Sequence, residues 1–233
     1  MKTYIKTDLE EYLKNDWIMA LLRQNGNEQE DEIRTNQWLM TMDNKRLIYA
    51  DVYGDILKEK TSVKVLDVGG GYNSLTKILA AHSQYTLLDF MAHGGDFYLS
   101  EMSEQYHINW LEKDWYELEK MEDYDVIIAN DIFPDVDQRL ELFIEKMIPH
   151  CHELRLVLTY YNTPCFYTTK RVDDSEIMTF LSWDGEIIGI KLRKYLDRSN
   201  ATEYELDEMK SNNSSIYRNG RQVSYMVIKG DLK

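Results

Sequence analysis

The sequence has few cysteines, few prolines and few glycines for its length. Its two cysteines, Cys151 and Cys165, are too few among 233 residues for a disulfide framework or a self-sufficient metal cluster. Three prolines and eleven glycines exclude collagen-like chains and disordered chains rich in these residues. We therefore expect one well-folded unit, without a bound metal, in a reducing compartment such as the cytoplasm.

Positive charge is also scarce, because 27 Lys and Arg stand against 41 Asp and Glu and give a formal net charge of −14. A surface field of this sign repels polyanions, and the sequence has no basic tract that would offset it. This balance argues against tRNA, rRNA and DNA as partners, whereas a protein substrate stays open.

Long apolar runs are missing from the first 22 residues, where acidic and basic side chains interrupt every apolar stretch. We expect neither a signal peptide nor a membrane span here, and no partnership with a membrane. Apolar residues recur at steps of four, which predicts a helix that buries one stripe. These residues are Ile5, Leu9, Leu13, Trp17 and Leu21.

Helical patterns continue through Trp38–Met42 and through residues 44–58, so residues 1–60 are predicted to form an N-terminal helical cap. The pattern then changes to short apolar runs that alternate with helical stretches, as parallel βαβ units require. The predicted strands are 63–68, 85–89, 124–130 and 154–160, and the predicted helices are 74–81, 95–105 and 136–147.

Residues 61–233 are accordingly predicted to form an α/β domain with a doubly wound, mostly parallel sheet. After residue 162 the sequence is less regular. A helix is expected from Ser175, and a last strand is expected at 222–229 after a turn at Asn219–Gly220.

Three consecutive glycines, Gly69, Gly70 and Gly71, stand between the first predicted strand and a helix, and the first of them is two residues after Asp67. Glycine suits this place because the chain turns sharply and a ligand can approach the bare backbone. Dinucleotide-binding loops of the pattern G-x-G-x-x-G would need glycine at position 74, where this chain has Ser74. A nicotinamide or flavin enzyme is therefore disfavoured.

Together, Asp67, Gly69 and Gly71 resemble the first motif of class I S-adenosylmethionine-dependent methyltransferases, D-x-G-x-G. Members of that family commonly have a further glycine where this chain has Asn73. We attribute the tolerated change to the ease with which Asn adopts left-handed backbone.

The resemblance implies a Rossmann-like fold with seven strands, and S-adenosyl-L-methionine as cofactor. It implies that Asp89, at the end of the second strand, binds both ribose hydroxyls, that Asp114 accepts from the adenine amine and that Trp115 covers the ring. The other residues expected to bind the cofactor are Gly70, Tyr72, Phe90, Asn130 and Asp131.

Methyl transfer requires an acceptor held in line with the methyl group and, for a protonated acceptor, removal of a proton. The residues predicted to serve catalysis are His93, Tyr160 and Tyr161. The residues predicted to contact substrate are Arg46, Tyr53, Asn162, Lys170 and Arg171. Four further histidines, His82, His107, His150 and His152, fall at the other edge of the predicted sheet and are interpreted as structural or solvated.

These features predict methylation of an oxygen or nitrogen of a small polar metabolite, such as a sugar or an intermediate of secondary metabolism. A homodimer is left open. The alternatives are a non-catalytic regulatory domain that binds S-adenosylmethionine or S-adenosylhomocysteine, and a nucleotide-dependent oxidoreductase on the same type of sheet.

Overall fold

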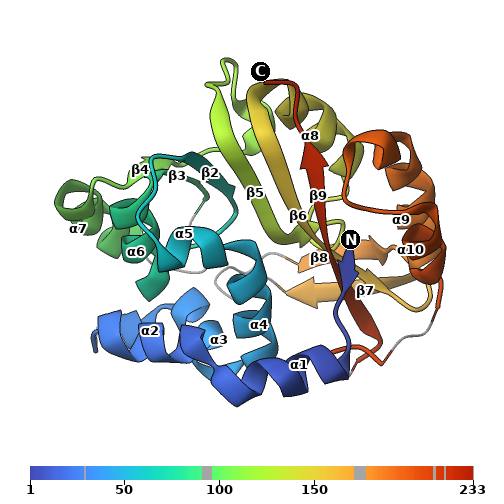
Figure 1. Ribbon diagram of the computed structural model, residues 1–233, viewed down its shortest axis with the longest axis horizontal. Helices are drawn as coiled ribbons and strands as arrows, with labels where there is room; N and C mark the ends of the chain where they lie inside the picture. The colour runs from blue at the N-terminus through green and yellow to red at the C-terminus, as the bar shows by residue number, and fades with distance from the viewer. Residues whose placement is uncertain (29, 91–95, 171–176, 212–213, 218, 233) are drawn as a thin grey trace. The chain divides into compact units, whose positions relative to one another are not determined.

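The computed structural model describes residues 1–28, 30–90, 96–170, 177–211, 214–217 and 219–232, with the backbone alone at 96–98, 102, 169 and 170 (Figure 1). The chain divides into two compact units, residues 9–120 and residues 1–8 with 121–233. The predicted boundary at residue 60 separates a cap from a cofactor domain and stays a prediction.

Three parallel strands form the sheet part of the unit 9–120: β2 (Lys64–Val68), β3 (Gln84–Leu88) and β4 (Asn109–Leu111). Val68 pairs with Leu88, and Leu88 pairs with Leu111, so the three carboxyl ends meet at one edge. Strands β2 and β3 were predicted from their apolar runs. Strand β4 was not, because three residues are too short for a periodic signal.

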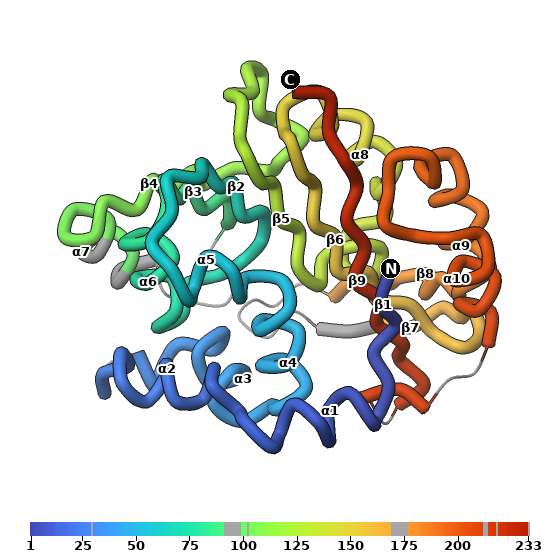
Figure 2. The backbone as a smooth tube through the Cα atoms, viewed as in Figure 1, coloured from blue at the N-terminus to red at the C-terminus, as the bar shows by residue number. Residues whose placement is uncertain are grey.

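Among the helices of this unit, α2, α3 and α4 lie side by side, and α6 packs against α2, α5 and α7 (Figures 1 and 2). The predicted helix 44–58 is in fact two helices that break at Tyr53. The bounds are α2 Trp17–Asn25, η2 Glu30–Glu32, α3 Arg34–Thr41, α4 Asp43–Val52, α5 Gly54–Lys58, α6 Ser74–His82, α7 Asp96–Tyr106 and η3 Trp115–Glu117, where η marks a 3₁₀ turn.

The first predicted helix is also interrupted. Helix α1 (Lys6–Tyr12) runs across the division of the two units and continues as η1 (Leu13–Asn15). A new helix, α2, then begins because the Asp16 carboxylate accepts a hydrogen bond of 3.1 Å from the Met19 amide and caps the free amides of its first turn.

The unit of residues 1–8 and 121–233 has a mixed sheet. Strand β5 (Tyr124–Phe133) runs parallel to β6 (Cys151–Tyr161), β9 (Arg221–Lys229) is antiparallel to β6, and β1 (Lys2–Thr3) is antiparallel to β9. Figure 2 traces β5, β6 and β9 as neighbours. The helical elements here are α8 Leu140–Met147, η4 Ile148–His150, α9 Gly185–Leu192, η5 Arg193–Arg198 and α10 Glu203–Glu208.

The helix predicted from Ser175 is wrong for the described part of that stretch. Residues 171–176 lie outside the described residues, and Ile177–Ser182 forms strand β8, which pairs antiparallel with β7 (Cys165–Lys170). Its residues alternate between more and less exposed side chains, which is the period of a strand. The next helix, α9, begins only at Gly185, where the Asp184 side chain accepts from the Ile187 amide.

The strands of the large sheet follow the order β1-β9-β6-β5-β2-β3-β4. Five strands of this order, β6 and β5 and then β2, β3 and β4, belong to parallel pairs, whereas β9 pairs antiparallel with both β6 and β1. The predicted fold class, a mostly parallel seven-stranded sheet flanked by helices, is confirmed. No helix among the described residues is long and apolar enough to cross a bilayer.

Candidate functional site

The glycine loop leaves β2 with two residues in left-handed backbone, Gly69 (φ 67°) and Gly71 (φ 62°). Few residues other than glycine adopt such angles without strain, which explains why glycine stands at these two positions. The Gly69 amide donates to the Leu88 carbonyl over 2.8 Å and holds the loop against the end of β3.

Asn73 ends the loop in a way that the sequence did not reveal. Its backbone is extended (φ −152°), so our explanation by left-handed tolerance is wrong. Its side-chain oxygen instead accepts from the Leu75 amide over 2.9 Å, while its own amide donates to the Thr76 hydroxyl. Asn73 therefore starts helix α6 as its cap.

Asp67 lies beneath the loop and is 2% exposed. Its carboxylate accepts hydrogen bonds from Tyr53 over 3.0 Å and from Tyr85 over 2.7 Å. A Cβ on Gly70 would lie 2.4 Å from Asp67 Oδ2, so the loop backbone rests directly on this carboxylate. Burial raises the pKa of Asp67 to about 7; the two tyrosine hydrogen bonds oppose this shift, and the charge of Asp89 adds to it.

This raised pKa predicts how stability depends on pH. Folded Asp67 holds its proton up to about pH 7, whereas the unfolded side chain loses it near its ordinary value of 3.8. The contribution of Asp67 to the free energy of unfolding should therefore decrease as pH rises from about 4 to about 7. We expect Asp67→Asn to lose this contribution, so that urea unfolding shows the variant gaining stability relative to the wild type between pH 5 and pH 8. A constant difference across this range would contradict the assignment.

Asp89 follows β3 and meets the glycine loop at the carboxyl edge of the strands. Its Oδ2 accepts from the Gly71 amide over 2.9 Å, and its carbonyl accepts from the Trp110 indole over 3.0 Å. The side chain is half-buried, and the next residue, Phe90, is 54% exposed. The structure thus brings Asp89 to the loop as predicted, while its contact with ribose stays a prediction.

Asp114 and Trp115 follow β4 at the same edge. Asp114 caps the 3₁₀ turn η3 by accepting from the Tyr116 amide over 2.7 Å. Trp115 is buried, and its ring makes an edge contact with Tyr116, whose own side chain is 58% exposed. The roles predicted for these two residues at the adenine remain predictions.

Three residues among the first 72 that were predicted to contact substrate or cofactor form hydrogen bonds or ion pairs within the protein. Arg46 pairs with Asp16 over 2.8 Å and donates to the Leu39 carbonyl. The Tyr53 hydroxyl is held by Asp67, and the Tyr72 hydroxyl donates to Glu30 over 2.9 Å. Contacts of these residues with substrate or cofactor stay predictions.

In the unit that contains residues 121–233, a bulge follows Asn130 in β5, and Asp131 adopts left-handed backbone (φ 64°). Asp131 Oδ1 accepts from the Thr159 hydroxyl and from Arg221 Nη2, each over 2.6 Å. Strained backbone of this kind persists only where neighbours hold it, and here a cation and a hydroxyl do so.

Arg221 joins a larger cluster that sequence reasoning missed. Its guanidinium lies 3.3 Å from Asp135 Oδ2 and 4.9 Å above the Tyr217 ring. Asp135 also accepts from the Tyr167 hydroxyl over 2.8 Å. Burial, the largest single influence, lowers the pKa of Arg221, but the charges of Asp131 and Asp135 help to raise it, and the net result is a raised pKa. No local signal marked this arginine, because its partners lie about 90 residues earlier.

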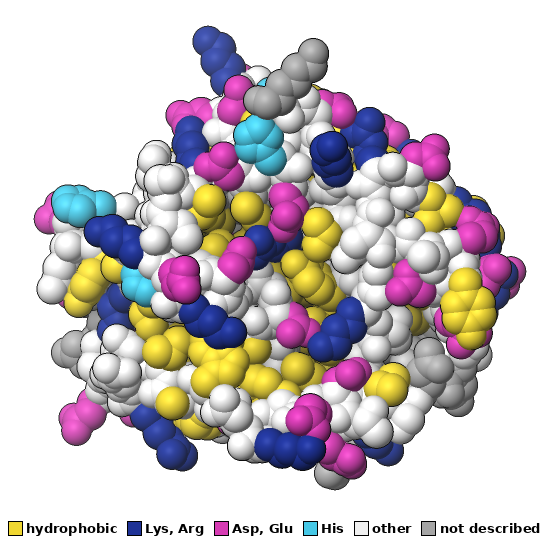
Figure 3. Space-filling model, viewed as in Figure 1, with side chains coloured by type: hydrophobic (Ala, Val, Ile, Leu, Met, Phe, Trp, Pro, Cys, Tyr) yellow, Lys and Arg dark blue, Asp and Glu magenta, His cyan; other side chains and the backbone are white. Residues whose placement is uncertain are grey.

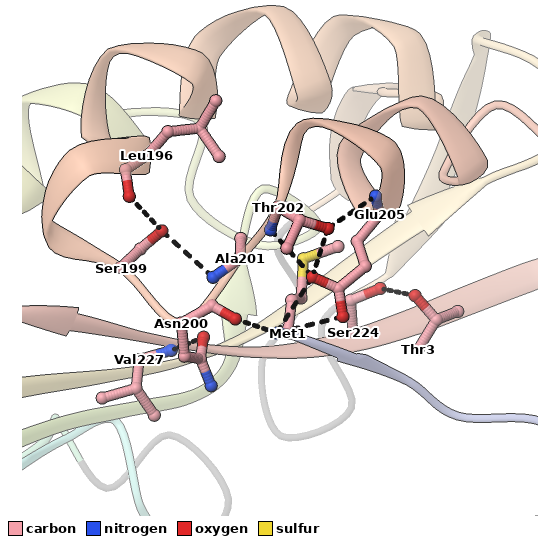
Figure 4. A network of polar contacts seen from close by, with 10 residues as sticks. All are labelled: Met1, Thr3, Leu196, Ser199, Asn200, Ala201, Thr202, Glu205, Ser224 and Val227. Atoms are coloured by element: carbon pink, nitrogen blue, oxygen red, sulfur yellow. Dashed lines mark hydrogen bonds and ion pairs between the residues drawn. The ribbon is translucent and has the colours of Figure 1, made fainter.

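Tyr160 and Tyr161 point to opposite faces of β6, as neighbours in a strand do. Tyr160 is 1% exposed, and its hydroxyl lies 3.1 Å from the Ser224 hydroxyl, which bonds to Thr3 (Figure 4). Tyr161 is half-buried with its ring beside Tyr167. Burial raises the pKa of both phenols, so neither is a tyrosinate near neutral pH.

We expect the two phenylalanine variants to differ. Tyr161→Phe should lower turnover more than cofactor affinity, because its hydroxyl belongs to the polar cluster at the carboxyl end of β6. Tyr160→Phe should instead cost about 1 kcal/mol of unfolding free energy through its lost hydrogen bond. Steady-state kinetics and urea unfolding separate these effects, and equal kinetic losses in both variants would refute the distinction.

The remaining predicted residues are placed only in part. Asn162 is exposed and accepts from the Gln222 amide over 3.0 Å. Lys170 ends β7, but its side chain is not described, and Arg171 and His93 lie outside the described residues. Their predicted roles stay open to test.

Three of the other histidines, His82, His150 and His152, contact backbone or acidic groups of the protein. His82 lies 2.9 Å from the Ile56 carbonyl, and His150 lies 3.2 Å from Asp123. Within the described ranges, no three His, Cys, Asp or Glu residues are grouped as a metal site would need. Figure 3 shows Lys and Arg side chains dispersed among Asp and Glu on the visible face, in keeping with the acidic composition.

A sequence model of the nodulation protein S (NodS) family matches residues 23–149, which is more than half of the chain. No curated protein matches the sequence. Among solved structures, Burkholderia thailandensis 1,6-didemethyltoxoflavin-N1-methyltransferase is similar at 10% identity and a TM-score of 0.51, with 99% of this chain and 93% of that chain covered.

Coclaurine N-methyltransferase, bound to N-methylheliamine and S-adenosylhomocysteine, is similar at 17% identity and a TM-score of 0.50, with 94% of this chain and 87% of that chain covered. The N-methyltransferase NodS from Bradyrhizobium japonicum has a TM-score of 0.46 at 12% identity, with 82% of this chain and 99% of that chain covered. At these identities the first two likenesses show a shared fold.

Proposed function

The chain belongs to the nodulation protein S (NodS) family, and from this premise we propose that it is an S-adenosylmethionine-dependent methyltransferase acting on a nitrogen or oxygen of a small polar metabolite. The two similar solved structures with TM-scores of 0.50 and 0.51 are both N-methyltransferases by name. Membership of this family does not favour the alternative of a non-catalytic regulatory domain.

The observation that carries the proposal is the junction of Asp89 with the glycine loop. A half-buried carboxylate, fixed by the Gly71 amide over 2.9 Å, stands at the carboxyl edge where open α/β sheets bind ligands. The left-handed Gly71 turns its backbone amide toward this carboxylate. These groups fit an adenosyl cofactor, since the carboxylate can accept from ribose hydroxyls.

When bound, the cofactor would supply an electrophilic methyl group. Two tasks would then fall to residues of the unit 9–120: Asp89 and the loop would hold the ribose, and Asp114 would hold the base. Asp131 and Asp135, in the other unit, are both paired with Arg221. A neutral amine can attack the methyl group before it loses a proton, whereas a hydroxyl needs a base to remove its proton as it attacks.

Methyl transfer can be measured directly with S-adenosylmethionine labelled in its methyl group. The acceptors should be matched pairs of small metabolites that differ only in an amine or a hydroxyl at one position. Label transferred to either member supports the proposal, and the preferred member identifies the acceptor atom. Cofactor binding without transfer to any acceptor of either kind would favour the regulatory alternative.

A further inference from the structure

A buried carboxylate lies behind the glycine loop. Glu30, in the 3₁₀ turn η2, is 0% exposed. Its Oε1 accepts from the Tyr72 hydroxyl over 2.9 Å and pairs with Lys77 Nζ over 2.8 Å, while its Oε2 lies 2.9 Å from the Ser74 hydroxyl. A fully buried carboxylate is costly unless such partners satisfy it, so these contacts fix the three residues together.

The residues that follow Glu30 hold the loop at further points. Asn36 Oδ1 accepts from the Ser74 amide over 3.1 Å, and the Thr35 hydroxyl donates to the Tyr72 carbonyl. A Cβ added to Gly71 would lie only 2.5 Å from the methyl carbon of Thr35, so Thr35 occupies the space that a side chain on Gly71 would need. Residues 30–36 thus contact the loop through its backbone as well as its side chains.

We propose that Glu30 is a positioning residue for the glycine loop and thereby sets the affinity for the cofactor. It acts through Tyr72 and Ser74, which bracket Asn73 and follow the left-handed Gly71. A loop that is ordered before binding spares the cofactor the free energy of ordering it. The inference rests on the proposed function, because it takes the loop ligand to be S-adenosylmethionine or S-adenosylhomocysteine.

The test compares Glu30→Gln and Tyr72→Phe with the matched control Glu32→Gln, which changes an exposed acid in the same turn. We expect S-adenosylhomocysteine to bind both variants about tenfold more weakly, since each loses a contact to a charged group. The control should bind as the wild type does. The KM for S-adenosylmethionine should rise while kcat at saturation changes little, a split that a general loss of folded protein would not produce.

Hydrogen exchange of the protein without ligand provides a second readout. Amides of residues 69–74 should exchange faster in Glu30→Gln and Tyr72→Phe, whereas amides of β6 should not change. Faster loop exchange in a chain whose wild type binds neither cofactor nor product would support the positioning role and overturn the proposed function. If the wild type binds the ligand and both variants show the same affinity and the same loop exchange as the wild type, the positioning role alone is overturned.

Loss of Glu30 leaves Lys77 without its buried partner and can prevent folding. The double variant Glu30→Gln/Lys77→Met removes that charge, and Tyr72→Phe leaves the ion pair intact. If Glu30→Gln does not fold, these two variants decide the question. Wild-type affinity and wild-type loop exchange in both would refute the proposal.

Discussion

Asp89→Ala is expected to bind S-adenosylhomocysteine about a hundredfold more weakly than the wild type while remaining folded. The proposed partners of this carboxylate are two ribose hydroxyls, and two hydrogen bonds to a charged group together account for about 3 kcal/mol. The half-buried side chain also holds the Gly71 amide over 2.9 Å, so its loss loosens the loop as well. Isothermal titration calorimetry measures the affinity, and circular dichroism verifies the fold.

Two further variants make this result specific. Asp89→Asn keeps one acceptor oxygen and should lose about tenfold in affinity. Glu119→Ala removes an exposed acid of the same unit and should bind normally. Wild-type affinity in a folded Asp89→Ala protein would remove this residue from the cofactor site.

Arg221→Met is expected to have the largest effect on stability, with a loss of about 3–5 kcal/mol in the free energy of unfolding. Methionine preserves the aliphatic packing but leaves Asp131 and Asp135, 18% and 12% exposed, without the cation that lies 2.6 Å and 3.3 Å from them. Half-buried carboxylates without a counter-ion are costly, and Asp131 is also held in left-handed backbone at this point. Urea unfolding at pH 7 measures the loss.

A surface arginine in the same unit provides the control. Arg198 pairs with Asp231 over 2.8 Å, with 40% and 52% of the side chains exposed. Arg198→Met should change the free energy of unfolding by no more than about 1 kcal/mol, because water screens such pairs. Adding Asp131→Asn to Arg221→Met should recover part of the loss. Equal effects of the two arginine variants would contradict a buried role for Arg221.

Local patterns predicted much of the fold and part of the site. The apolar runs of β2, β3, β5, β6 and β9 are strong signals, because strands buried on both faces are continuously hydrophobic. The glycine triplet after Asp67 predicted a sharp turn, and two of its members do adopt left-handed backbone. Asp89 could be placed at the loop because parallel strands bring their carboxyl ends to one edge.

What the sequence did not reveal depends on distant partners. Tyr72 stands within the loop, yet its hydroxyl bonds to Glu30, 42 residues earlier. Arg46 looks like a substrate cation but is held by Asp16, and Arg221 is held by acids about 90 residues away. Pairings of this kind arise from packing, and no periodic pattern or motif encodes them. The β7–β8 hairpin was missed because its short alternating strands resemble an irregular stretch.

Titration of the purified chain with S-adenosylhomocysteine, with NAD as the control ligand, tests the central claim most directly. Binding of S-adenosylhomocysteine that is lost in Asp89→Ala, with no binding of NAD, is the result that this account predicts. Binding of NAD in place of S-adenosylhomocysteine would contradict it and would assign the glycine loop to a nucleotide-dependent oxidoreductase.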